Sequence, residues 1–189
     1  MKTFDYFGWT TISNDQMLHR FVAEKFDMSK EDIDSMNKII DEYVPQRDVV
    51  LDIGCHYGFF TKFLSEKFKK VHAFDFPNDI YECFEINMTK FKCDNVVRHP
   101  YGIGEKDKPV ATNDWFKEYN RRGPLGNHID VHANATKKYE IKALDNLNLG
   151  KVDLIMVDTE GYELNVIRGA VKTIMEYKPV LVLEFHNKR

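Results

Sequence analysis

The sequence predicts a doubly wound α/β fold of the Rossmann-like type, built around a mostly parallel sheet. Two observations carry this prediction: five short apolar runs recur along the chain, and segments with helical periodicity separate most of them. Near-continuous apolar strands are typical of parallel sheets, because helices cover both of their faces. The expected strands are 48–54, 70–76, 95–100, 151–158 and 179–185.

The helices follow from capping residues and apolar spacing. Ser29 predicts the N-cap of a first helix that ends before Pro45, and further helices are expected at 57–68 and 78–91. A last helix at 161–177 would place four apolar residues on one face: Leu164, Ile167, Val171 and Ile174.

Residues 105–149 are less regular, with one expected strand at 139–143, and such a long insertion suits a substrate lid. At 189 residues the chain is long enough for one domain with a single core. We expect that domain to span 1–189, with an N-terminal helical segment at 1–47 and an α/β core at 48–189.

Composition excludes several classes of protein. The chain has 43% hydrophobic and 30% charged residues and a net charge of −3, so it is neither disordered nor suited to nucleic acid. No apolar run is long enough for a membrane span, and the first residues do not resemble a signal peptide, so we expect a cytoplasmic protein. The three cysteines have no metal or disulfide spacing, so we expect reduced thiols.

The loop after the first apolar run is the clearest candidate binding site. In open parallel sheets, ligands bind at the carboxyl ends of the strands where the strand order reverses, which here means residues 52–58. A dinucleotide fingerprint would need glycine at position 56, which is His56, so NAD is disfavoured. Asp75 ends the second strand, where a carboxylate can accept both hydroxyls of a ribose. With no phosphate-binding P-loop, S-adenosylmethionine is the adenosine cofactor that fits best.

A second acidic group follows the fourth strand, at Asp158, Glu160 and Glu163. The first and fourth strands are neighbours at the reversal point, so Asp158 should face the loop at 52–54. Glu160 and Glu163 also stand near a helix N-terminus, where simple capping is an alternative role for both.

These motifs make the chain resemble the FkbM family of S-adenosylmethionine-dependent methyltransferases. The matching segments are VVLDIGCHYGFF, HAFDFPNDIYECFEINM with Asn87, IKALDNL with Asp145, VDLIMVDTEGYELNVIRGA and PVLVLEFH. The family loop usually has Ala-Asn where this chain has Cys55 and His56. No residues follow for the strand pair that closes the methyltransferase fold, so we expect that pair to be lacking.

The resemblance implies O-methylation of a hydroxyl on a sugar or small metabolite. Position and resemblance together suggest eight residues that bind the cofactor: Asp52, Gly54, His56, Tyr57, Gly58, Asp75, Phe76 and Asp158. The candidate bases are Glu160, Glu163 and His186, of which Glu160 is favoured because it lies nearest the expected cleft.

Other functions remain as alternatives: a module that binds the cofactor without turnover, or, less favoured, an NAD-dependent oxidoreductase. DNA base methylation is disfavoured because the fourth strand ends in Asp-Thr-Glu-Gly. No metal site is expected, since the neighbours of His128 and His132 do not form a helix.

The last strand, 179–185, would lie at an edge of the sheet. An apolar edge strand invites pairing with another chain, so we expect a homodimer through it. Cover by residues 2–11 or by the strand at 139–143 is the alternative.

Overall fold

The computed structural model describes residues 3–6, 8–12, 30–112 and 137–184. Its centre is a parallel sheet of five strands in the order β10-β9-β3-β4-β5. These strands are β3 (Val49–Ile53), β4 (Lys70–Phe74), β5 (Val96–His99), β9 (Leu154–Val157) and β10 (Val180–Leu183). Each lies within one of the five expected runs, and the order reverses between β3 and β9. The doubly wound fold class is therefore confirmed.

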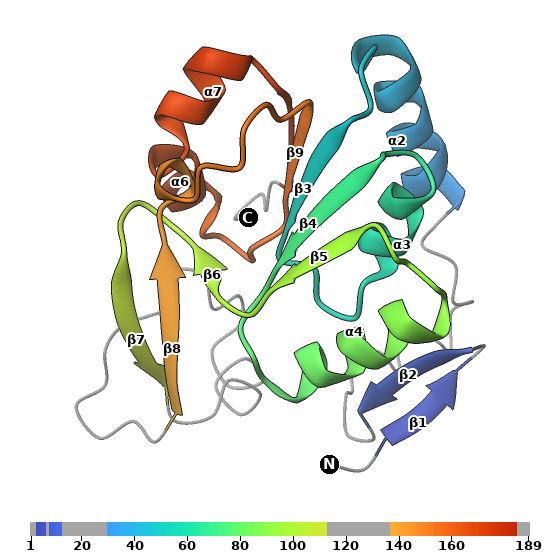
Figure 1. Cartoon of the computed structure of the whole chain (residues 1–189). Helices are drawn as coiled ribbons and strands as arrows, with labels where there is room; N and C mark the ends of the chain where they lie inside the picture. The colour runs from blue at the N-terminus through green and yellow to red at the C-terminus, as the bar shows by residue number, and fades with distance from the viewer. Residues whose placement is uncertain (1–2, 7, 13–29, 113–136, 185–189) are drawn as a thin grey trace, which may run out of the picture.

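Helices cover both faces of this sheet (Figure 1). One face carries α2 (Lys30–Tyr43), α3 (Phe59–Ser65) and α4 (Asp79–Lys90). The other carries α6 (Glu163–Arg168), α7 (Val171–Tyr177) and the short 3-10 helix η2 (Leu144–Asn146). The strands supply alternate residues to the two faces, as their period of two requires.

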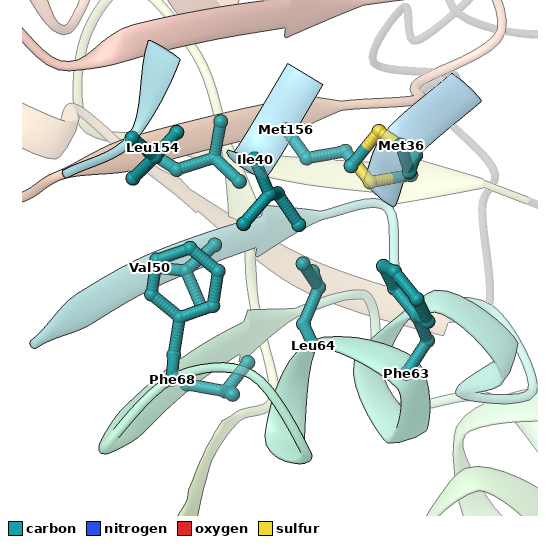
Figure 2. Packing of buried hydrophobic residues seen from close by; sticks show 10 residues of the cluster. Met36, Ile40, Val50, Phe63, Leu64, Phe68, Leu154 and Met156 are labelled. Carbon is teal, nitrogen blue, oxygen red and sulfur yellow. The ribbon is translucent and has the colours of Figure 1, made fainter. Parts of the chain in front are cut away.

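Figure 2 shows the core beneath α2 and α3. Met36 and Ile40 of α2 meet Leu64 of α3 over Val50 and Met156 of the sheet. All five are almost fully buried, and burying a large apolar side chain stabilises a fold by roughly 1.5–3 kcal/mol. The strands beneath this core are parallel, so their carboxyl ends lie at one edge of the sheet.

The expected helix at 161–177 is two helices, because the chain breaks after Arg168. A Cβ at Gly169 would lie 1.9 Å from the carbonyl oxygen of Gly104, so only glycine permits this approach of the two backbones. The break also changes which side chains are buried: Leu164 and Val171 are exposed, whereas Val166 is fully buried. The single apolar face predicted for this segment is therefore wrong.

The N-terminal segment is not wholly helical, contrary to expectation. Strands β1 (Thr3–Tyr6) and β2 (Trp9–Ile12) form an antiparallel hairpin, which lies beside α4 in Figure 1. Tyr57, expected to open a helix, lies in the loop before α3, which is also shorter than predicted.

A second sheet was predicted only in part. The expected strand at 139–143 is β8 (Lys137–Lys142), which pairs with β6 (Gly102–Ile103) and β7 (Lys108–Thr112). Neither β8 nor the hairpin pairs with β10, so neither of the two alternative intrachain covers is formed among the described strands. Ser29, His128 and His132, and most of the expected lid, lie outside the described residues.

The structure bears on two expectations drawn from composition, namely the state of the cysteines and the presence of membrane-spanning helices. Cys55, Cys83 and Cys93 are free and buried. Among the residues described, no helix combines the length and apolar character needed to cross a membrane.

Candidate functional site

The candidate site begins where β3 and β9 end side by side. Gly54 has φ +94°, and a Cβ there would lie 1.8 Å from the carbonyl oxygen of Asp158. The Asp158 N–H donates to the carbonyl of Ile53 at 2.9 Å, which extends the parallel ladder past the strand ends. Glycine at position 54 is thus required for the contact, and Asp158 faces the loop as the strand-neighbour argument predicts.

Asp52 is the most buried acid of the site, with 1% of its surface exposed. Its carboxylate accepts a hydrogen bond from the Thr61 hydroxyl of α3. Burial raises the pKa of Asp52 to about 7, and the nearby charges of Asp158 and Asp75 act in the same direction, while the Thr61 bond opposes them. Three acids therefore interact electrostatically at the strand ends.

Asp75 follows β4 and is half-buried. Its Oδ2 accepts the N–H of His56 at 2.9 Å and its Oδ1 accepts the N–H of Phe76 at 2.7 Å. Burial raises the pKa of the Asp75 carboxyl, and the His56 N–H bond is the largest of the effects that oppose it. Each carboxylate oxygen has two lone pairs, so both can still accept a ligand hydroxyl.

A further acidic cluster lies beyond β9 and β10. One carboxylate oxygen from each of Asp158, Glu160 and Glu184 lies within 4.8 Å of the others. Burial raises the pKa of Asp158, and the Glu184 carboxyl beside it adds to that rise. Such a group of acids can hold a cation, whether a metal ion or the cationic part of an organic ligand.

Glu163 has a different position. Its Oε1 accepts the backbone N–H and the hydroxyl of Thr159, both at 3.1 Å, and the N–H of Gly161 at 2.9 Å. The carboxylate therefore shapes the loop at 159–161, in which Glu160 has φ +54°. These donors belong to the loop that precedes α6, so Glu163 braces that loop, and the capping alternative stays a prediction.

The other residues expected in the site differ in how far their side chains are exposed to solvent. His56 is exposed at the rim, with φ +49°. Tyr57 is fully buried and Phe76 nearly so, which makes both packing residues of the loops. Gly58 has φ +91° and abuts Met88 of α4, since a Cβ there would lie 2.5 Å from the Met88 Cε. His186 lies outside the described residues.

Two residues of the site, Thr61 and Glu184, were not predicted from the sequence. Thr61 lies nine positions after Asp52 and donates to its carboxylate. The sequence feature that could have identified it is a polar residue on the inner face of a predicted helix. Glu184 joins Asp158 and Glu160, and its signal is an acid directly after the last apolar run. The rule that ligands meet the carboxyl ends of parallel strands would have selected Glu184 as well.

A family model and a curated relative match this chain. The model described as methyltransferase FkbM domain matches residues 52–189. Methyltransferase 1 of Beauveria bassiana (strain ARSEF 2860) is 24% identical over 151 residues, which cover 66% of this chain and 59% of that protein. The chain thus spans about three-fifths of that relative's length.

Solved structures resemble the fold at low sequence identity. The crystal structure of methyltransferase FkbM from Methylobacillus flagellatus KT has a TM-score of 0.52 and 18% identity, covering 73% of this chain and 32% of that chain. Precorrin-6y C5,15-methyltransferase from Geobacter metallireducens GS-15 has a TM-score of 0.49 and 16% identity, covering 85% of this chain and 64% of that chain. The first of these supports the Rossmann-like methyltransferase fold.

Proposed function

The chain belongs to the methyltransferase FkbM family, and from that premise we propose that it transfers a methyl group from S-adenosylmethionine to a hydroxyl group. The proposed acceptor is a sugar or another small metabolite, as the family resemblance implies. One observation supports this choice of cofactor. Asp52, Asp75 and Asp158 lie close together at the carboxyl edge of the sheet, where the strand order reverses.

The side chains at this edge fit S-adenosylmethionine chemically. Asp75 would accept the two ribose hydroxyls, because its oxygens keep lone pairs beyond their backbone bonds. Asp52 and Asp158 would face the cationic end, where a positive charge relieves the repulsion between the acids. The bound cofactor supplies an activated methyl group on a positively charged sulfur, so no acid is needed to assist the leaving group.

Glu160 is the proposed base for the acceptor hydroxyl. It follows β9 beside Asp158 and is half-buried, whereas Glu163 is engaged by three donors of its own loop. We assign Glu163 the role of orienting residues 159–161. A base must come within hydrogen-bond reach of the hydroxyl that it deprotonates, and the position of Glu160 beside Asp158 at the strand ends supports this role.

Cofactor binding is tested by calorimetric titration with S-adenosylhomocysteine. Asp75→Ala should weaken binding by about 1–3 kcal/mol, roughly 5- to 150-fold, because buried ribose hydroxyls lose their acceptor. Asp79→Ala, which removes an exposed acid from the nearby start of α4, is the matched control and should leave the affinity unchanged. A wild-type protein that binds NAD but not S-adenosylhomocysteine would contradict the proposal.

Turnover is tested with a labelled methyl donor and a panel of sugars and hydroxylated metabolites. Glu160→Gln should retain cofactor affinity and lower kcat, because the substitution keeps the shape and removes the basicity. Glu176→Gln, on the exposed side of α7, is the control. Cofactor binding without transfer to any acceptor would instead favour a non-catalytic binding module. The cytoplasmic location and the absence of a nucleic-acid partner stay predictions.

A further inference from the structure

The Asn87 side chain joins three segments that are distant in the sequence. It lies on α4 and is fully buried. Its Oδ1 accepts the N–H of Thr10 at 2.7 Å, and its Nδ2 donates to the carbonyls of Thr10 and Tyr57, both at 3.0 Å. The amide thus pairs with the open backbone edge of β2 and, at the same time, with the loop between Gly54 and Gly58.

Packing connects the same segments. Tyr57 forms a buried cluster with Ile12 of β2 and with Ile80 and Cys83 of α4. The Trp9 ring of β2 contacts the rings of Phe59 and Phe91, with centroid distances of 4.4 and 4.5 Å. The hairpin, α4 and the loop are therefore one packed unit, as the position of the hairpin beside α4 in Figure 1 indicates.

The backbone of residues 54–58 needs support from outside the loop. Three of its five residues have positive φ: Gly54, His56 and Gly58. This conformation is unfavourable for a residue such as His56, so it persists where neighbouring groups hold it in place. The Asn87 bond to the Tyr57 carbonyl supplies one such constraint, directly after His56.

We infer that Asn87 is a positioning residue that holds residues 54–58 in the shape required for the cofactor and makes that shape depend on docking of the N-terminal hairpin. The cofactor part of this inference rests on the proposed function. The structural link between hairpin and loop does not, since it consists of contacts within the chain. Asn87 acts through the Tyr57 carbonyl, and the hairpin acts through Asn87 and through the packing of Ile12 with Tyr57.

Amide hydrogen exchange without any ligand tests the structural link. In Asn87→Ala, exchange in a peptide covering 54–58 should accelerate at least about fivefold, the lower end of usual coupling between sites. The matched control is Asn95→Ala, because the Asn95 amide likewise donates to two carbonyls, of Ser65 and Phe68, at 2.9 and 2.8 Å. That variant should leave exchange at 54–58 unchanged. Equal acceleration in both variants would overturn the inference, because it would reflect global destabilisation.

Thr10→Pro tests the hairpin from its own side of the contact. Proline removes the N–H that the Asn87 oxygen accepts and places a ring carbon against that oxygen, so β2 can no longer dock on the amide. Exchange at 54–58 should again accelerate, by less than in Asn87→Ala. An unchanged loop in this variant would overturn the dependence on the hairpin.

Titration with S-adenosylhomocysteine tests the cofactor part. Asn87→Ala should raise the Kd at least about fivefold, and Asn95→Ala should leave it unchanged. A loop that opens in Asn87→Ala with no loss of affinity would overturn the positioning role. If the wild-type protein itself fails to bind, the proposed function fails, and the exchange measurements still decide whether hairpin and loop are linked.

Discussion

At the scale of one residue, Asp52 shows how burial changes the titration of an acid in the candidate site. Its pKa is raised from 3.8 to about 7, chiefly by burial, so the folded protein holds a proton there that the unfolded chain releases between these values. The contribution of Asp52 to stability is therefore present below pH 4 and is lost as the pH rises through 7. Above pH 7 the ligand-free protein contains an unfavourable buried charge.

Asp52→Asn should for this reason stabilise the ligand-free protein at pH 8. The gain in unfolding free energy is at most about 4 kcal/mol, from 1.36 kcal/mol per pKa unit, and should shrink toward pH 5. Asparagine keeps an oxygen that accepts the Thr61 hydroxyl, so shape and hydrogen bond persist. Urea unfolding at the two pH values measures the effect, with exposed Asp79→Asn as control. An equal change at both pH values would contradict this account.

At the scale of elements, α7 begins with a cap supplied from elsewhere in the chain. Asp145 of η2 accepts the N–H groups of Lys172 and Thr173 and the hydroxyl of Thr173, all at 2.9 Å. Ala170, at the N-cap position of the helix, has no side chain that could do so. The break after α6 and the start of α7 are thus stabilised by a residue that precedes β9.

Asp145→Ala should lower the unfolding free energy by about 1–2 kcal/mol, because the first turn of α7 loses its acceptors. Asp145→Asn should lose less, since one amide oxygen can still accept. Denaturant unfolding of both variants beside Glu176→Ala, on the exposed side of the same helix, gives the comparison. Identical stability of Asp145→Ala and wild type would show that α7 does not need this cap.

Strands β4 and β5 share a histidine pair that is uncharged at neutral pH. His72 Nδ1 lies 2.8 Å from His99 Nε2, and the Tyr101 hydroxyl lies 3.0 Å from His99 Nδ1. Burial lowers the pKa of His72 to about 4, and the nearby His99 and Lys70 lower it as well. The folded state binds fewer protons than the unfolded chain, so the contribution of His72 is present above pH 6.5 and is lost as the pH falls through 4.

His72→Gln should therefore destabilise the protein at pH 7.5 and do so less at pH 4.5. The change with pH is at most about 3 kcal/mol, again from 1.36 kcal/mol per pKa unit. The variant is compared with wild type at each pH, because the acids of the site shift stability in the opposite direction over the same range. A difference that does not change with pH would mean that His72 keeps its ordinary pKa in the folded protein.

At the scale of the whole molecule, β10 has one neighbour among the described strands, β9. Leu181 and Leu183 are exposed on it, and its four residues carry no charge that would oppose pairing with another chain. The hairpin and β8 lie elsewhere, so a second copy of the chain remains the expected partner. This homodimer, like the single-domain organisation over 1–189, stays a prediction.

Light scattering after size exclusion, at micromolar concentration, should give twice the 22.3 kDa mass of the chain. Leu181→Lys should yield the monomer, because a charge at the edge disfavours strand pairing. Met175→Lys, which adds the same charge on the exposed side of α7, should remain dimeric. A wild-type monomer, or a dimer that both variants preserve, would defeat the prediction.

The amino-acid sequence by itself determined the five core strands, the doubly wound class and the acids at the strand ends. These features are local: an apolar run, a helical repeat or an acid after a strand can be recognised within a few residues. Only the tertiary structure decided the N-terminal hairpin, the second sheet around β8, the division into α6 and α7, and the roles of Glu163 and Asn87. The second sheet, the break at Gly169 and the bonds of Asn87 depend on groups that are distant along the chain, such as Asn87 with Thr10 or Gly169 with Gly104, and so leave no local pattern. The hairpin and the Glu163 bonds are local, but they follow no apolar repeat that would predict them.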